Sequence, residues 1–394
     1  MVRLVTFTNL FPSAELPTHG AFVADRMQRV AAKSGLPWTV VAPVPAVVPW
    51  LRFGAHRRWA RLPGREVWHG VAVQHPRYRH WPGLGMRRQA AAMAKGARAA
   101  VAALAAAEPI VLDAHYLWPD GVAAATLAAE LGVPFTLTAR GSDVNVLAAD
   151  PVVRAGIAAA AARAAACWAV SGDLAARFAD VVGLPRARVV EVRNGVDLVQ
   201  FCPGDAVAAR AELGLPATGR LLLGVGRLVP GKGFATAAAA LPRLPNDVHL
   251  VLVGEGPERQ RLLALAPGRV HCLGNRPRGV VATAYRAADL LVLPSEREGW
   301  PNVVTEALAS GLRVLATPVG GIPEILGHPA KGDLRLGALA PVGDVAAFAA
   351  AALALLASPA EPLAVRAFAA RYGWDEPVAL LAATFRGLLG VAAA

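Results

Sequence analysis

The sequence predicts an α/β protein of two domains, each built on a parallel sheet. The chain has 394 residues, enough for two domains of ordinary size with separate cores. Short apolar runs rich in Val, Leu and Ala alternate with segments of helical spacing, which is the pattern of α/β layers. The apolar runs lead into polar or glycine-rich loops, and open α/β sheets bind ligands at such strand ends.

The first half opens with a strand within residues 1–9, a loop that ends at Gly20, a helix over 21–34 that closes at Gly35, and a strand at 38–43. Gly20 would let the backbone approach a ligand closely, although a tight turn without a ligand explains it equally well. Ser171 is placed to cap the helix that follows it. We expect further strands at 110–115, 134–139, 168–171 and 189–193, and helices at 121–131 and 173–182.

Polar residues follow two of these strands. His115 ends one strand, and Arg140 and Asp143 follow the next. Because neighbouring parallel strands end at one edge of a sheet, we expect the three side chains to share that edge. A lone histidine is more often structural than catalytic, but two polar strand ends favour a site.

Residues 50–100 contain eleven Lys and Arg against one acidic residue, Glu66. Aromatic and basic residues mix in two clusters, 47–62 and 78–88. This mixture suits an anionic membrane surface, and we expect such contact through residues 47–98. The alternative is that the rings pack on the domain while the arginines stay solvated. The chain shows none of the modules that read nucleic acid, so we expect no nucleic-acid partner.

Phe201-Cys202-Pro203-Gly204 breaks the pattern and marks a domain boundary. We therefore expect domains at 1–200 and 201–370, with residues 371–394 forming a helix that packs back on the first domain. In the second domain we expect strands at 221–226, 249–254, 270–274, 290–294 and 314–317, and a helix at 280–288.

A glycine-rich loop follows the first strand of the second domain. It runs from Gly226 to Gly233 and has the G-x4-G-K spacing of a P-loop, but Gly233 stands where a P-loop has the Ser or Thr that holds magnesium. We therefore reject an NTPase. A phosphate-binding loop remains, in which Arg227 and Lys232 could neutralise a diphosphate. The alternative is two solvated basic residues.

The strand at 290–294 leads through an acidic loop into a short helix. Pro301 suits the first turn of that helix, and Gly311 suits the position just past its end. Glu298 lies in the loop and Glu306 about a turn and a half into the helix. A helix start offers free N–H groups to an anion, and the carboxylates can accept hydrogen bonds from sugar hydroxyls. The segment therefore predicts a site for a phosphorylated sugar or nucleotide.

Five motifs occur in a specific order: Asn194-Gly195-Val196-Asp197, Gly226-Arg227-Leu228 with Lys232-Gly233, Val253-Gly254-Glu255-Gly256-Pro257, Glu298-x7-Glu306, and Gly320-Gly321-Ile322-Pro323-Glu324. With them the chain resembles glycosyltransferase family 4 over about residues 4–375. The resemblance implies the GT-B fold, in which two Rossmann-like domains with parallel sheets face each other across a donor-binding cleft.

The resemblance also implies a retaining transfer of sugar from a UDP-, GDP- or ADP-sugar, without a metal or other cofactor. Arg227 and Lys232 would hold the diphosphate, Glu298 the transferred sugar and Glu306 the ribose. His115 completes the expected catalytic set near the acceptor, and Arg140 and Asp143 are candidates for donor or acceptor contact. The remaining expected donor-binding residues are Gly20, Gly254, Glu255, Trp300, Pro301, Asn302 and Val303. Arg140 stands where relatives often have a histidine that touches the donor sugar.

We expect a transferase for cell-surface polysaccharide or glycolipid, with a lipid-linked or glycan acceptor. Alternatives are a soluble transferase making a small glycoside or glucan, and a GT-B nucleotide-sugar epimerase. The three cysteines lack paired spacing, and the first strand is too short for a signal peptide. The apolar segment 345–357 is short of the roughly 20 residues of a membrane span. We therefore expect a cytoplasmic protein, peripheral at the inner membrane face.

Overall fold

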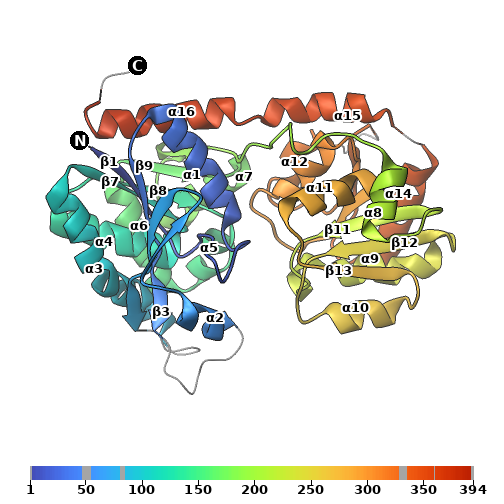
Figure 1. Ribbon diagram of the computed structural model, residues 1–394, viewed down its shortest axis with the longest axis horizontal. Coiled ribbons are helices and arrows are strands. Elements are labelled where there is room, and N and C mark those ends of the chain that lie inside the picture. Colours follow the sequence, from blue (N-terminus) through green and yellow to red (C-terminus); the bar gives the residue numbers. More distant parts are fainter. Residues whose placement is uncertain (1, 47–54, 80–84, 328–334, 359, 392–394) are drawn as a thin grey trace. The chain divides into compact units, whose positions relative to one another are not determined.

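The computed structural model describes residues 2–46, 55–79, 85–327, 335–358 and 360–391. The chain divides into two compact units (Figure 1). Unit 1 comprises Met1–Asn194 with Asp375–Ala394, and unit 2 comprises Gly195–Trp374. The chain therefore crosses between the units after Asn194 and after Trp374, close to the boundaries expected at 200 and 370.

Unit 1 contains a sheet of eight strands in the order β10-β9-β8-β7-β1-β2-β5-β4. Its pairings are parallel except for that of β4 with β5, and β3 and β6 form a separate parallel pair. The strands are β1 Arg3–Phe7, β2 Trp38–Val41, β3 Val44–Ala46, β4 Arg65–Trp68, β5 Val71–Gln74, β6 Arg77–Arg79, β7 Ile110–His115, β8 Phe135–Ala139, β9 Ala166–Ala169 and β10 Val189–Glu191.

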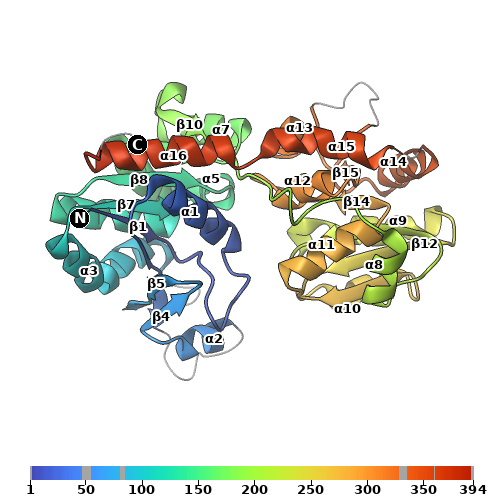
Figure 2. The same cartoon turned by 45° about the horizontal axis from the view of Figure 1, so that its top comes forward.

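Helices flank this sheet, and the C-terminal helix α16 lies beside α1, as Figure 2 shows. The Phe385 ring meets Trp168 edge-on at 5.5 Å, and Arg386 donates to the carbonyl of Ser34 at 2.8 Å. Ser171 caps α7 as predicted, because its hydroxyl accepts from the N–H of Leu174. The helices are α1 Ala21–Ser34, α2 Ala55–Arg61, α3 Gln89–Ala107, α4 Val122–Leu131, α5 Ser142–Asn145, α6 Pro151–Arg163, α7 Gly172–Val182 and α16 Asp375–Leu388.

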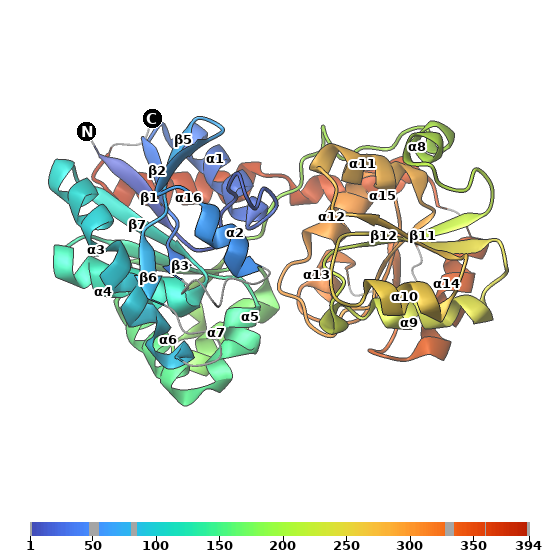
Figure 3. The same ribbon diagram turned by 60° about the horizontal axis from the view of Figure 1, so that its bottom comes forward.

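Unit 2 contains a parallel sheet of six strands in the order β13-β12-β11-β14-β15-β16. Figure 3 shows α8, α11 and α12 on one face and α9, α10 and α14 on the other. The strands are β11 Arg220–Val225, β12 Val248–Val253, β13 Val270–Gly274, β14 Leu290–Leu293, β15 Val314–Ala316 and β16 Gly337–Leu339. The helices are α8 Ala206–Leu213, α9 Phe234–Ala240, α10 Arg259–Leu265, α11 Arg278–Ala287, α12 Asn302–Ala309, α13 Ile322–Ile325, α14 Val345–Ala357 and α15 Pro362–Ala369.

The strand order decides which loops meet. In unit 2, β12 and β13 lie on one side of β11, and the next strand along the chain, β14, lies on its other side. The loops after β11 and β14 therefore flank the switch point, where open α/β sheets bind ligands. Unit 1 has the same arrangement at β1 and β7, so the loop that ends at Gly20 meets the strand that ends at His115.

The central strands are buried along their whole length because helices cover both faces of each sheet. Every residue of β7, β8 and β14 is buried. Among the described residues, one unbroken helix, Met86–Ala107, has the length and hydropathy of a membrane span. Its buried residues include Met93, Ala97 and Val101, and α3 packs against α4 and β6 within unit 1.

Candidate active site

The loops after β11 and β12 are held together by close backbone contacts. A Cβ at Gly254 would lie 1.9 Å from the carbonyl oxygen of Gly226, so this position requires glycine. The N–H of Leu228 donates to the carbonyl of Glu255 at 2.9 Å. The Glu255 carboxylate accepts from Arg259 at 3.1 Å, and its side chain is 47% exposed. Gly254 and Glu255 therefore shape the glycine-rich loop through their backbones.

Gly233 ends that loop in a left-handed conformation with φ 66°. A Cβ there would lie 1.9 Å from the carbonyl oxygen of Pro294, which explains why the Ser or Thr of a P-loop cannot stand at this position. Lys232 precedes it and points to the loop after β14. The Arg227 side chain is exposed, and within the described part of the chain it forms no ion pair.

Glu298 lies beside Lys232 in the loop after β14. Its Oε1 accepts from the Lys232 ammonium and from the Ser295 hydroxyl, both at 2.6 Å. The Glu298 side chain is 10% exposed and that of Lys232 is 25% exposed. Both hydrogen bonds go to the same carboxylate oxygen, so Oε2 can still accept from a ligand.

Helix α12 begins after Pro301, which has φ −78° and an extended ψ of 99°. Pro301 thus occupies the N-cap position and not the first turn as we predicted, because its ψ is not helical. Gly311 lies just past the helix end with φ 78°, as predicted. The Trp300 side chain is buried edge-on against Tyr372 at 5.5 Å, so its backbone is the part that a ligand could meet. The N-cap residue, Pro301, makes no side-chain hydrogen bond to the helix start, which includes Asn302 and Val303.

Glu306 is buried on α12 between two side chains of α11. Its Oε2 accepts from the Tyr285 hydroxyl at 3.1 Å, and its Oε1 accepts from Arg278 at 3.4 Å. Burial raises the pKa of Glu306, while Arg278 and the Tyr285 hydrogen bond lower it. Neither Tyr285 nor Arg278 was predicted as a site residue. Arg278 lies outside the helix expected at 280–288, but in the observed α11 the seven-residue spacing places the two residues on one face.

In unit 1, Gly20 begins α1 with φ 67°. A Cβ there would lie 2.2 Å from both the carbonyl carbon and the carbonyl oxygen of Leu10. Nearby, the His19 ring lies 2.9 Å from the carbonyl of Asn9. The loop after β1 is therefore packed directly on the start of α1, and Gly20 makes that contact sterically permissible.

His115 is buried at the end of β7, and both of its ring nitrogens have partners. Nε2 lies 2.7 Å from the Asp113 carboxylate, and Nδ1 contacts the Arg140 guanidinium. Burial lowers the pKa of His115 to about 4; Asp113 opposes this shift and Arg140 adds to it. The ring is therefore neutral at pH 7, donates from Nε2 and accepts at Nδ1. Thr136 fixes the other oxygen of Asp113 at 2.9 Å.

Arg140 and Asp143 lie beside His115, so the three predicted side chains share one edge of the sheet. Arg140 also donates to Asn194 at 3.1 Å and lies 5.1 Å over the Phe22 ring. The buried Asp143 carboxylate accepts from the backbone N–H groups of Leu117, Arg140, Gly141 and Val144. The Asp143 carboxylate therefore stabilises the loop after β8.

Much of the two aromatic and basic clusters, residues 47–54 and 80–84, lies outside the described residues. Within the described part, Tyr78 is 3% exposed and its hydroxyl accepts from Gln89 at 3.1 Å. Its ring therefore packs inside unit 1, as the alternative interpretation has it. Arg57, Arg58 and Arg61 of α2 are exposed to solvent.

Comparisons with known proteins agree with this architecture. A model of Glycosyltransferase Family 4 matches residues 48–200, and a model of Glycosyl transferases group 1 matches residues 219–358. The chain is 33% identical over 340 residues to TuaC of Bacillus subtilis (strain 168), which is named as a teichuronic acid biosynthesis glycosyltransferase. That match covers 83% of both proteins.

Two solved structures share the fold. Sucrose-phosphate synthase from Thermosynechococcus elongatus has a TM-score of 0.77 at 21% identity and covers 99% of both chains. HepE from Anabaena, solved in complex with UDP-glucose, has a TM-score of 0.73 at 19% identity and covers 98% of this chain and 100% of its own. The chain has the GT-B fold, and its match to TuaC covers most of both proteins. It therefore belongs to glycosyltransferase family 4 and is a glycosyltransferase.

Proposed function

We propose that this enzyme transfers a sugar from a nucleotide-sugar with retention of configuration, and that Arg227 and Lys232 take the place of a metal. The observation that carries the proposal is the 2.6 Å contact between Lys232 and Glu298. It sets a cation for the diphosphate directly beside a carboxylate for the sugar. HepE, which shares the fold, was solved with UDP-glucose, so UDP-sugars are the first donors to test.

In the proposed step, the bond between the sugar C1 and the donor phosphate oxygen breaks, and a bond to the acceptor oxygen forms on the same face. The acceptor proton passes to the leaving phosphate. Lys232 has three N–H donors, of which Glu298 uses one, so the others can stabilise the charge that develops on the phosphate. Arg227 is exposed on the same loop and adds a second cation. The Oε2 of Glu298 accepts from a sugar hydroxyl near C3.

A donor with its diphosphate at Lys232 and its sugar at Glu298 would also reach the remaining predicted donor-binding residues. Glu306 would accept from the ribose hydroxyls, and the start of α12, from Trp300 to Val303, would offer backbone N–H groups to the phosphates. Gly254 and Glu255 support the loop, and Gly20 lets the first loop of unit 1 approach the donor. Because His115 is held on both nitrogens, we propose that it orients Arg140 for a donor or acceptor contact.

Glu298→Gln tests the proposal because it keeps the shape of the side chain and removes its charge. We expect turnover to fall by orders of magnitude while the affinity for the nucleoside diphosphate, measured by calorimetry, stays nearly unchanged. Equal loss of turnover and nucleotide affinity would contradict the assigned role. Product stereochemistry by NMR tests retention, and an inverted anomer would refute the same-face step. A chelator should leave the rate unchanged; a loss restored by a divalent metal would overturn metal independence.

We also propose an acceptor in cell-surface polysaccharide or glycolipid synthesis, on the likeness to the teichuronic acid enzyme. The exposed arginines of α2 suit a peripheral contact with anionic lipid at the inner membrane face. Co-flotation with anionic but not with neutral vesicles is the expected result. A soluble transferase predicts flotation with neither, and an epimerase predicts conversion of the donor sugar without any acceptor.

A further inference from the structure

Two histidines lie together at the edge of the unit 2 sheet. The outermost strand on one side is β13, which lies beside β12 (Figure 1). His271 of β13 is in register with Val251 of β12, and His249 lies two residues before Val251, so both histidines project from the same face of the sheet. Nδ1 of His249 lies 3.1 Å from Nε2 of His271, and the two ring planes are inclined at 41°.

The two rings bind each other and are partly exposed to solvent. Within the described part of the chain, this contact is the one hydrogen bond of either ring. It needs a lone pair on one of the two nitrogens, so at least one ring is neutral. Arg269 precedes His271 by two residues, but its guanidinium donates to the backbone carbonyls of Val248 and Pro245, at 2.9 and 2.7 Å. A ligand from solvent would therefore have to replace only the contact between the rings.

The separation of the two nitrogens suits a shared metal ion. With metal–nitrogen distances of about 2.0–2.1 Å, two ligand nitrogens lie about 3.3–3.4 Å apart in a tetrahedral site and about 2.9 Å apart at a right angle. The observed 3.1 Å lies between these two values. Because both rings are partly exposed, they can turn their lone pairs toward one ion on the solvent side.

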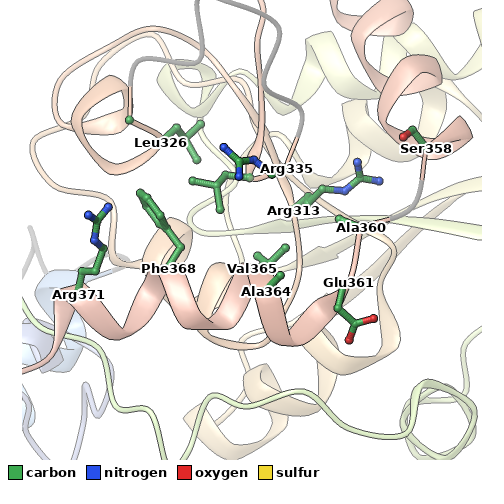
Figure 4. A pocket seen from close by; sticks show the side chains of 12 residues that line it. Arg313, Leu326, Arg335, Ser358, Ala360, Glu361, Ala364, Val365, Phe368 and Arg371 are labelled. Atoms are coloured by element: carbon green, nitrogen blue, oxygen red, sulfur yellow. The ribbon is translucent and has the colours of Figure 1, made fainter.

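The histidine pair is separate from the other features of unit 2. His249 and His271 are the second residues of β12 and β13, near the amino ends of these strands, whereas the donor loops follow the carboxyl ends of β11, β12 and β14. The cavity beside α15 is a different place, and its side chains labelled in Figure 4 include Arg313, Arg335 and Arg371 and no histidine. An ion at the pair would therefore leave the donor loops unoccupied.

We propose that His249 and His271 together bind one divalent transition-metal ion, with Zn²⁺ as the representative of the class. Imidazole nitrogen suits Zn²⁺, Cu²⁺ and Ni²⁺, whereas Mg²⁺ prefers oxygen ligands. Among the described residues no three His, Cys, Asp or Glu side chains gather as metal ligands, so water completes the coordination. The ion joins the edge strand β13 to β12, and it stabilises the folded chain because the unfolded chain does not hold the two rings together.

Isothermal titration of the metal-free full chain with ZnCl₂ tests the proposal. We expect saturable binding of zinc, tighter binding of Cu²⁺, and no binding of Mg²⁺ under the same conditions. Zinc should also raise the melting temperature, and it should leave the transfer rate unchanged because the pair lies away from the donor loops. The absence of saturable zinc binding, or equal affinity for zinc and magnesium, would overturn the proposal.

Variants locate the bound ion. His249→Gln and His271→Gln should each weaken zinc binding at least roughly tenfold. The double variant should lose little more than either single variant, since one ion needs both nitrogens, and zinc should no longer raise its melting temperature. His69→Gln is the matched control, because His69 is an exposed histidine of unit 1 and should not affect this affinity. Unchanged affinity in both single variants, or an equal loss in His69→Gln, would refute the site.

Discussion

Tyr285→Phe isolates the hydrogen bond that orients Glu306. The Tyr285 hydroxyl lies 3.1 Å from Glu306 Oε2 and 3.3 Å from the carbonyl of Val303, and the residue is 1% exposed. Phenylalanine keeps the ring and its edge-on contact with Phe201 at 5.8 Å. The substitution therefore removes the hydroxyl and leaves the packing in place.

The expected magnitude follows from the charge of the acceptor. A hydrogen bond to an ionised group contributes about 1.5–3 kcal/mol net. The Tyr285 bond also lowers the pKa of Glu306, so its loss makes the carboxylate easier to protonate and a poorer acceptor for ribose hydroxyls. The lower end of that range corresponds to roughly tenfold in a dissociation constant. We expect the variant to bind the nucleoside diphosphate roughly tenfold more weakly.

Calorimetry with a ribonucleotide and with its 2′,3′-dideoxy analogue distinguishes this effect from general damage to the fold. The 2′,3′-dideoxy nucleotide lacks the hydroxyls from which Glu306 would accept hydrogen bonds, so the variant and the wild type should bind it with the same affinity. Tyr372→Phe is the matched control, because its hydroxyl donates to the backbone carbonyls of Glu324 and Ile325. Equal weakening of ribo and dideoxy nucleotides by Tyr285→Phe, or no weakening of either, would refute the assignment of Glu306 to the ribose.

Three further predictions concern stability and are measured by urea unfolding. Gly233→Ala should cost more than about 3 kcal/mol because its Cβ would overlap a carbonyl oxygen, whereas Gly231→Ala, which has open space, should be nearly neutral. Gly20→Ala should cost clearly more than Gly35→Ala: both glycines have φ near 67°, but only Gly20 faces a backbone carbonyl. Equal costs within either pair would contradict the steric argument. For His115, a folded-state pKa near 4 against 6.5 unfolded means that stability is present above pH 6.5 and is lost as the pH falls toward 4, on the order of 3 kcal/mol. His115→Gln should flatten this dependence, and an unchanged slope would show that another group causes it.

Elements with local signals could be predicted from the sequence. Helix α1 has the predicted bounds, because glycines with positive φ lie at both of its ends and its apolar residues recur at helical spacing. Strands β7 and β13 also begin and end where expected. Every residue of β7 is buried, whereas four of the five residues of the edge strand β13 are only partly buried. The family motifs supported the fold class in the same way, because each one follows a strand.

The missed elements lack such signals. The pair β4 and β5 was not expected, because β4 alternates exposed with partly buried residues at a sheet edge and carries charge at Arg65 and Glu66. Partners distant in sequence were also beyond prediction. Lys232 and Glu298 lie 66 residues apart. No local pattern in the sequence indicates that Lys232, expected to bind the diphosphate, pairs with Glu298, expected to bind the sugar.

The two glutamates of the Glu-x7-Glu motif look alike in sequence but occupy different environments. Glu298 has an ammonium at 2.6 Å, so its charge is compensated before any ligand binds. Glu306 is buried, its nearest cation is Arg278 at 3.4 Å, and burial outweighs that cation because its pKa is raised. A diphosphate that draws Lys232 away from Glu298 would therefore free a carboxylate beside the sugar, whereas Glu306 depends on Tyr285 and Arg278 to stay ionised. It follows that Glu298, the proposed sugar ligand, should respond to phosphate binding, and that Glu306, the proposed ribose ligand, should respond to its neighbours on α11.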